Sequence, residues 1–226
     1  SWQYRGIITF VLGEDTVEYM SLFTAGGFEG TPIDCNEGVL EWVEKDQIPE
    51  LNLWEGDRIF FRLLEEQKEF FSLKLVYNKQ DILEQAVLDA KELELFDILN
   101  EDGSKTGVVK ERGVAHREGA LHGTVHIWIV RENDKSGYDV LLQKRSDNKD
   151  SYPGCYDISS AGHISAGDGV MESALREFEE ELGLSAQPEQ LELFGTTLVK
   201  FETTFSGKIF RDNEFSNDFV YRQPVD

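Results

Sequence analysis

Residues 162–184 constrain this chain most, because their spacing predicts one helix with two different faces. At about 100° per residue, the apolar side chains gather on a face that we expect to be buried: Ala174, Leu175, Phe178 and Leu182. The acidic Glu177, Glu180 and Glu181 follow the spacing i, i+3, i+4 and meet on another face. Like charges at this spacing repel, whereas a hard divalent cation prefers carboxylate oxygens as ligands. Taken alone, the acidic face is compatible with a cation site or with a solvated surface.

The ends of the expected helix over residues 168–182 fit the same interpretation. Asp168 lies near the helix start, where negative charge is favourable to the helix dipole, and Gly183 is a natural helix stop. The loop of residues 162–169 contains three glycines, which allow the backbone to approach a metal ion or a phosphate.

The whole stretch resembles the Nudix box, G-x5-E-x7-R-E-U-x-E-E-x-G-U, in which U is a bulky apolar residue. The matched Gly, Arg and Glu positions would coincide by chance on the order of once in 10⁷ placements. The one departure is Asp168, where the family has Glu, and it affects efficiency more than metal binding. The resemblance implies an α/β (α+β) fold, in which a mixed β-sheet is sandwiched between helices. It also implies hydrolysis by metal-assisted attack of water on phosphorus, with Mg²⁺ (or Mn²⁺) as the cofactor.

Residue roles follow from this resemblance. Glu180 is either a further metal ligand or the group that activates water, Arg176 orients a carboxylate of the box, and Asp168 pairs with Arg176. The implied metal ligands are Glu177, Glu180, Glu181 and the carbonyl group of Ala161, at an expected turn.

Residues 95–226 resemble the isopentenyl-diphosphate-isomerase-like branch of this superfamily. The resemblance is carried by residues 96–100, 112–116, 122–128, 142–145 and 153–154. True isomerases have a catalytic Cys before the Gly-His pair, where this chain has Ala161, so hydrolysis is favoured over isomerisation. Lys144 and Arg145 follow a predicted strand and are candidates for phosphate binding, with a solvated face equally compatible.

A second resemblance is carried by residues 28–30, 35–38, 40–42, 53–57 and 70–77. Through them, residues 1–78 resemble the C-terminal half of an oxidised-guanine nucleotide triphosphatase, and this half lacks a Nudix box of its own. Residues 79–94 then form an expected linking helix, and the domain at 95–226 ends short of its usual last elements. We therefore expect part of a tandem Nudix protein, with oxidised purine nucleoside triphosphates as the suggested substrates. The alternative is a permuted fold, in which residues 1–78 complete the domain at 95–226. Trp42 and Trp54 are compatible with base stacking or core packing. Glu37 and Glu41 are compatible with a metal or base contact, or with a surface role.

The four histidines receive no chemical role from the sequence. His122 and His126 share a strand face, but their backbones stand roughly 13 Å apart, which is too far to share one ion easily. Glu214 is an additional candidate acid, expected in a loop. Elsewhere, strands are predicted over residues 4–12, 17–24, 39–43, 70–77, 122–131, 138–144, 191–204 and 215–221, a hairpin over 96–110, and a helix over 55–65.

The formal net charge of −22 over 226 residues disfavours a nucleic-acid partner, because the protein repels phosphate backbones. No membrane helix or secretion signal is predicted, and Cys35 and Cys155 are expected as free thiols in the cytoplasm. The expected partner is therefore a small nucleotide or diphosphate, and an incomplete half-domain favours homodimerisation. Two alternatives to hydrolysis stay open: an isomerase of allylic diphosphates, and a catalytically silent nucleotide sensor.

Overall fold

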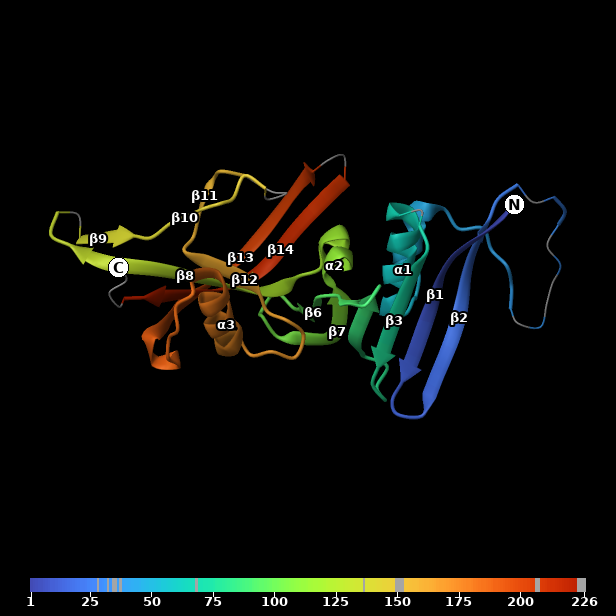
Figure 1. Cartoon of the computed structure of the whole chain (residues 1–226), viewed down its shortest axis with the longest axis horizontal. Helices are drawn as coiled ribbons and strands as arrows, with labels where there is room; N and C mark the ends of the chain where they lie inside the picture. The colour runs from blue at the N-terminus through green and yellow to red at the C-terminus, as the bar shows by residue number, and fades with distance from the viewer. Residues whose placement is uncertain are drawn as a thin grey trace. The chain divides into compact units, whose positions relative to one another are not determined.

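The computed structural model describes residues 1–27, 29–31, 33, 36, 38–67, 69–135, 137–148, 153–205 and 208–222. The chain divides into two compact units, Ser1–Glu94 and Leu95–Asp226 (Figure 1). Among the described residues, none of the helices has the length and apolar character needed to cross a membrane.

The first unit is a five-stranded sheet with the order β2-β1-β3-β4-β5. Its elements are β1 (Trp2–Leu12), β2 (Thr16–Ala25), the 3₁₀ helix η1 (Lys45–Glu50), α1 (Glu55–Glu66), β3 (Phe71–Tyr77), β4 (Leu83–Leu88) and β5 (Lys91–Glu92). Helix α1 buries Ile59 and Leu63. The backbone N–H of Gly56 donates a hydrogen bond of 2.7 Å to the Tyr77 hydroxyl group, which ties the start of α1 to β3.

Two expectations for the first unit are wrong. Residues 79–94 form β4 and β5 rather than a linking helix, because Leu83 and Ala86 pair with β3 and are buried there. Residues 39–43 are not a strand.

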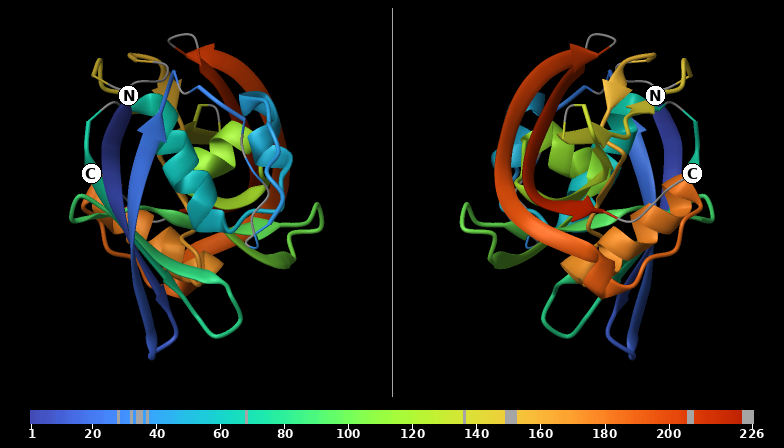
Figure 2. Two further views of the ribbon diagram at one scale, coloured as in Figure 1. Left: turned by 90° about the vertical axis from the view of Figure 1, so that its right-hand side faces the viewer. Right: turned by 90° about the vertical axis from the view of Figure 1, so that its left-hand side faces the viewer.

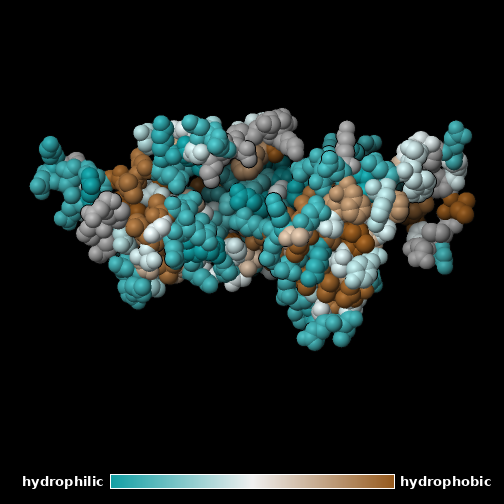
Figure 3. Space-filling view, in the orientation of Figure 1, coloured by the Kyte–Doolittle hydropathy of each residue, from teal (hydrophilic) through white to brown (hydrophobic). Residues whose placement is uncertain are grey.

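Hydrophobic side chains reach the surface of the first unit, as the brown atoms over its strands show (Figure 3). Trp2 and Tyr19 are 80% and 72% exposed, respectively.

The second unit is built on a seven-stranded sheet. Its elements are β6 (Leu95–Leu99), β7 (Lys105–Glu111), α2 (Arg112–Glu118), β8 (His122–Asn133), β9 (Gly137–Val140), β10 (Gln143–Lys144), β11 (Tyr156–Asp157), β12 (Ser160–His163), α3 (Val170–Leu182), the 3₁₀ helix η2 (Pro188–Gln190), β13 (Leu191–Phe205) and β14 (Lys208–Tyr221). The order is β13-β14-β8-β6-β7, and both β9 and β12 also pair with β8. Strands β8 and β14 run parallel, whereas β8 pairs antiparallel with β6, β9 and β12. Figure 2 shows β13 and β14 as a long curved hairpin.

Alternation along β8 gives the sheet an apolar face and a polar face. Val125, Ile127 and Ile129 belong to the core that packs against α3, where Phe178 is fully buried. The apolar face of α3 is therefore the face that its spacing predicts. The other face of β8 carries His122, and helix α2 lies on that side. The mixed sheet between helices confirms the expected fold class.

Candidate functional site

The acidic face of α3 meets strand β12. The Oε2 atom of Glu181 accepts a hydrogen bond of 3.1 Å from the backbone N–H of Ala161. A β-carbon added to the next residue, Gly162, would overlap the carboxyl group of Glu177. The missing side chain at Gly162 therefore provides the space in which this carboxylate lies against the strand. The expected turn at Ala161 is wrong, because residues 160–163 pair with β8 as a strand.

The Arg176 guanidinium group links three parts of this site. It forms an ion pair with Asp168, which lies just before the N-terminal end of α3. Its Nη2 atom donates to the backbone carbonyl of His163 at 3.2 Å and lies 3.5 Å from Oε1 of Glu177. The shorter side chain of Asp168 therefore still reaches Arg176.

The electrostatics of this face favour a bound cation. Burial raises the pKa of Glu177, Arg176 lowers it, and the nearby carboxylates of Glu181 and Glu180 raise it further. Glu180 and Glu181 are exposed. Three carboxylates thus share a small surface with one guanidinium group, which already pairs with Asp168. A divalent cation would relieve the remaining repulsion.

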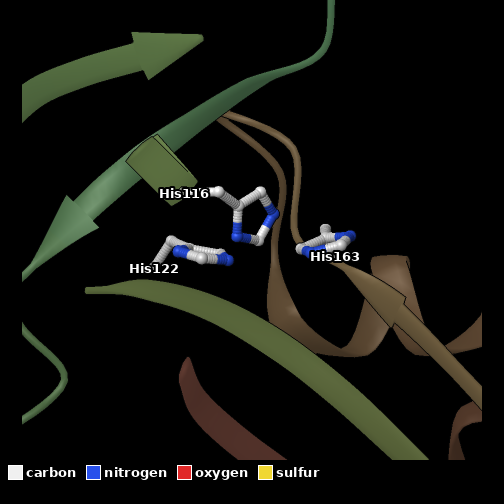
Figure 4. A group of neighbouring side chains, drawn as sticks. All are labelled: His116, His122 and His163. Carbon is white, nitrogen blue, oxygen red and sulfur yellow. The ribbon is translucent and has the colours of Figure 1, made fainter. Parts of the chain in front are cut away.

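Three histidines meet on the polar face of the sheet (Figure 4). His116 of α2, His122 of β8 and His163 of β12 each place a ring nitrogen within 4.8 Å of the others. The ring of Phe96 stacks on His122 at 4.6 Å and on His163 at 4.7 Å between centroids. Phe96 is fully buried, so it fixes the planes of two of the three imidazoles.

Hydrogen bonds to carbonyl groups set the tautomers of two of these rings. Nδ1 of His122 lies 2.9 Å from the carbonyl oxygen of Ala120, and Nδ1 of His116 lies 3.2 Å from that of Arg211. A carbonyl oxygen only accepts, so each Nδ1 carries the proton and each neutral ring has its lone pair on Nε2. Burial lowers the pKa of His122 to about 4, which keeps this ring neutral at pH 7. Its Nε2 is buried and has no hydrogen-bond partner among the described residues, so it is suited to a metal.

The third ring has a different environment. Nδ1 of His163 lies 3.4 Å from Nη1 of Arg112. Burial, and then the Arg112 guanidinium group, lower the pKa of His163 to about 2. Its Nε2 atom lies 3.9 Å from Oε1 of Glu214.

Two acidic residues of β14 complete this cluster. Single ligand atoms of His122, Asp212 and Glu214 lie within 4.8 Å of one another. Burial, and then the nearby Asp212, raise the pKa of Glu214 to about 8. Glu214 belongs to a strand rather than to the expected loop, and it is paired in register with His122. Histidine nitrogens and carboxylate oxygens in one place could hold a divalent metal ion.

The sequence did not predict this second cluster, because its members lie on four elements without a recognisable spacing. The strand spacing relates only His122 and His126 to one another, and Nδ1 of His126 instead lies 3.2 Å from Oδ1 of Asp218. Recognising that residues 214–221 pair in parallel with residues 122–129 would have placed Glu214 beside His122.

The structure places the candidate phosphate-binding residues at the β10–β11 hairpin. Lys144 pairs in register with Tyr156, and Nη1 of Arg145 forms an ion pair of 2.8 Å with Asp157. Arg145 is therefore already engaged by a carboxylate.

The candidate residues of the first unit have varied surroundings. Trp54 is 41% exposed and makes edge-on contacts with Phe10 and Tyr77, at 5.7 and 5.0 Å between centroids. Trp42 is 83% exposed, so it is not a core residue, and Glu41 is exposed as well. Glu37 and Cys35 lie outside the described residues, and Cys155 is an exposed free thiol.

Comparison with known proteins gives one family. Residues 120–226 match the family model described as the NUDIX domain. The chain is 49% identical over 127 residues to Nudix hydrolase 3 of Arabidopsis thaliana, covering 56% of this chain and 16% of that protein. It is 37% identical over 130 residues to an uncharacterized Nudix hydrolase of Clostridium acetobutylicum, covering 58% of this chain and 60% of that protein. An isopentenyl-diphosphate Delta-isomerase of Streptomyces griseus is 28% identical over 126 residues, covering 56% of this chain and 60% of that protein. The chain thus spans less than two thirds of the length of these relatives.

Proposed function

Residues 120–226 form a Nudix hydrolase domain, and on this premise we propose that the chain hydrolyses a phosphoanhydride bond with a divalent metal ion. The observation that carries the proposal is the junction of α3 with β12. There, Glu181 is hydrogen-bonded to the backbone of Ala161, and Glu177 occupies the space left by Gly162.

The residues at this junction fit a hard cation, with Mg²⁺ or Mn²⁺ as the proposed ion. Glu177 and Glu181 would hold it, together with the carbonyl group of Ala161, and Glu180 lies one helical turn from Glu177. A bound divalent ion would lower the pKa of water and neutralise phosphate oxygens. The raised pKa of Glu177 supports this assignment, because its negative charge is unfavourable in the folded protein and a bound cation would stabilise it.

The other residues of the site orient the metal ligands or accept a proton from the attacking water. Arg176 holds the Glu177 carboxylate in place, and Asp168 holds Arg176. Glu180 is exposed, and we assign it the removal of a proton from the attacking water or a further ligand role. The water oxygen forms a new bond to phosphorus, the bridging P–O bond breaks, and the leaving phosphate takes the electron pair. Lys144 and Arg145 are the proposed contacts to substrate phosphates.

The proposed substrates are nucleoside diphosphate-linked compounds, and oxidised purine nucleoside triphosphates are the finer suggestion. The latter rests on the likeness of residues 1–78 to the second half of another Nudix-like domain. Trp54, partly exposed and held edge-on by two aromatic rings, supports a stacking role in that unit. A cytoplasmic location, a small-molecule partner rather than nucleic acid or membrane, and a homodimer belong to the same proposal.

The histidine cluster supports a second candidate, an enzyme acting on an isoprenoid-type diphosphate. His116, His122 and His163, with two acids of β14, form a partly buried donor set that simple phosphoanhydride hydrolysis on α3 does not require. The similarity to an isomerase points in the same direction. Ala161 disfavours this candidate, because an alanine supplies no acid or base to an isomerisation.

The test is turnover of a panel of nucleotides and diphosphates, with Mg²⁺ or with a chelator, by wild type, Glu180→Gln and Glu179→Gln. Glu179 is the matched control, because it is an exposed neighbour on α3 outside the spaced acidic set. We expect metal-dependent release of phosphate-containing product that Glu180→Gln reduces at least about 100-fold and Glu179→Gln leaves intact. Nucleotide binding without turnover by wild type would instead favour the sensor.

A further inference from the structure

We propose that Asp97 is a positioning residue for the metal-dependent site, although it lies on β6 and outside the acidic helix. The inference rests on the proposed function. Asp97 fixes the loop of residues 164–169 and thereby the ion pair between Asp168 and Arg176, which orients Glu177.

The contact between Asp97 and the loop is direct. The backbone N–H of Gly167 donates a hydrogen bond of 2.9 Å to Oδ2 of Asp97. The Asp97 side chain is only 17% exposed, so water competes weakly for this bond. The same oxygen lies 2.6 Å from Nζ of Lys105, which is 52% exposed.

The loop is also held by backbone hydrogen bonds upstream of Gly167. The N–H of Ile164 donates to the carbonyl of Gly123 at 3.0 Å, and that of Ala166 donates to the carbonyl of Leu95 at 2.8 Å. Gly167 has a φ of +90°, where the chain reverses before α3. The bond from Asp97 therefore anchors the amide directly before Asp168, at a position where glycine has the greatest conformational freedom. The N–H of Asp168 itself donates to the carbonyl of Ser165 at 3.0 Å, so this closed turn of residues 165–168 moves together with Gly167.

From Gly167, the effect reaches the acidic face through the two ion pairs of Arg176. Asp168 follows directly in the chain and pairs with Arg176, and Arg176 lies 3.5 Å from Oε1 of Glu177. A loop that moves at Gly167 carries the Asp168 carboxylate away from Arg176. The Glu177 carboxylate then loses a defined orientation, although none of the residues on α3 has changed.

Substitutions can distinguish the hydrogen bond of Asp97 from its negative charge. Asparagine retains a side-chain oxygen that accepts from the Gly167 N–H, whereas alanine removes it. Lys105→Gln removes the cation beside Asp97 and leaves the Gly167 contact intact. If the bond positions the loop, asparagine rescues the function that alanine loses.

The experiment measures Mn²⁺ binding to the full chain by electron paramagnetic resonance of the free ion, alongside hydrogen exchange of residues 164–169. The variants are Asp97→Ala, Asp97→Asn and Lys105→Gln, and Glu181→Gln identifies the binding event that belongs to α3. We expect Asp97→Ala to weaken that event about threefold to tenfold and to accelerate loop exchange, a smaller effect than loss of a direct partner of a ligand. Asp97→Asn and Lys105→Gln should stay within about twofold of wild type, as expected for near-neutral changes.

Two results would overturn the inference while leaving the proposed function intact. One is an unchanged Mn²⁺ affinity in Asp97→Ala despite faster loop exchange, which would make Asp97 structural only. The other is an equal loss in Asp97→Asn and Asp97→Ala, which would implicate charge rather than the Gly167 bond. If wild type shows no Mn²⁺ binding that Glu181→Gln removes, the proposed function fails, and the inference fails with it.

Discussion

Replacing Gly162 by alanine should lower turnover strongly while costing little stability. The added β-carbon would overlap the carboxyl group of Glu177, so one of the two must move. The φ of Gly162 lies outside the positive range, so an alanine backbone is not strained there. The displaced atoms are the end of a flexible side chain, and Glu177 can rotate away from β12.

The structure allows the stability cost to be estimated. An unfavourable rotamer of Glu177 costs about 0.5–1.5 kcal/mol. The partly exposed contact with Arg176 contributes about 0–1 kcal/mol more. We therefore expect a loss of about 0.5–2.5 kcal/mol in the free energy of unfolding. Turnover should fall at least about 100-fold, because a proposed metal ligand leaves its place beside the strand.

Urea unfolding and metal-dependent turnover, measured on the same preparations, check this prediction. Gly195→Ala in β13 is the matched control, because a β-carbon there meets no atom within 4 Å. Gly195→Ala should leave both quantities close to wild type. Normal turnover by a folded Gly162→Ala protein would refute the assignment of Glu177 to the site.

Three further predictions concern stability and pH. Phe178→Ala should destabilise the second unit by about 3–5 kcal/mol in urea unfolding, because Phe178 is fully buried against the core sheet; a loss below about 1 kcal/mol would contradict this packing. Ala90→Gly should stabilise the first unit by up to about 1 kcal/mol, because Ala90 has a φ of +66° in a tight turn; destabilisation in thermal unfolding would refute this. The raised pKa of Glu214 means that the folded state keeps a proton that the unfolded state loses above its ordinary value of 4.5. The free energy of unfolding of the metal-free protein should therefore fall as pH rises toward about 8, and Glu214→Gln should remove this fall. The clearest window is pH 7–8, because the lowered pKa of His122 makes stability rise with pH between 4 and 6.5.

The sequence was most informative where local signals agreed with tertiary packing. Helix α3 begins at Val170 and ends at Leu182, close to the expected range, because an apolar stripe and the stop at Gly183 specify the same element. The hairpin of β6 and β7 was equally predictable from its turn at Asp102-Gly103. The fold class was predictable because residues 162–184 resemble the Nudix box, which implies a mixed sheet between helices.

The failures have physical causes. Apolar residues in 79–94 are compatible with a helix, but pairing with β3 buries Leu83 and Ala86 in a strand instead. The histidine cluster depends on β8, β12, β14 and α2 meeting in space, and a linear spacing does not contain that information. The turn expected at Ala161 is wrong for a similar reason. Pairing with β8 holds this residue in an extended strand, and the local sequence alone does not specify that pairing.

The most direct test of the central claim is hydrolysis in ¹⁸O-labelled water with Mg²⁺, followed by mass spectrometry of the products. The substrates are the nucleoside diphosphate-linked compounds and an allylic diphosphate. Our account predicts one ¹⁸O atom on a released phosphate product, dependent on the metal and lost in Glu181→Gln. An intact diphosphate that takes up deuterium in a parallel reaction in D₂O, without ¹⁸O on phosphorus in the labelled water, would contradict hydrolysis and assign the chemistry to the histidine cluster.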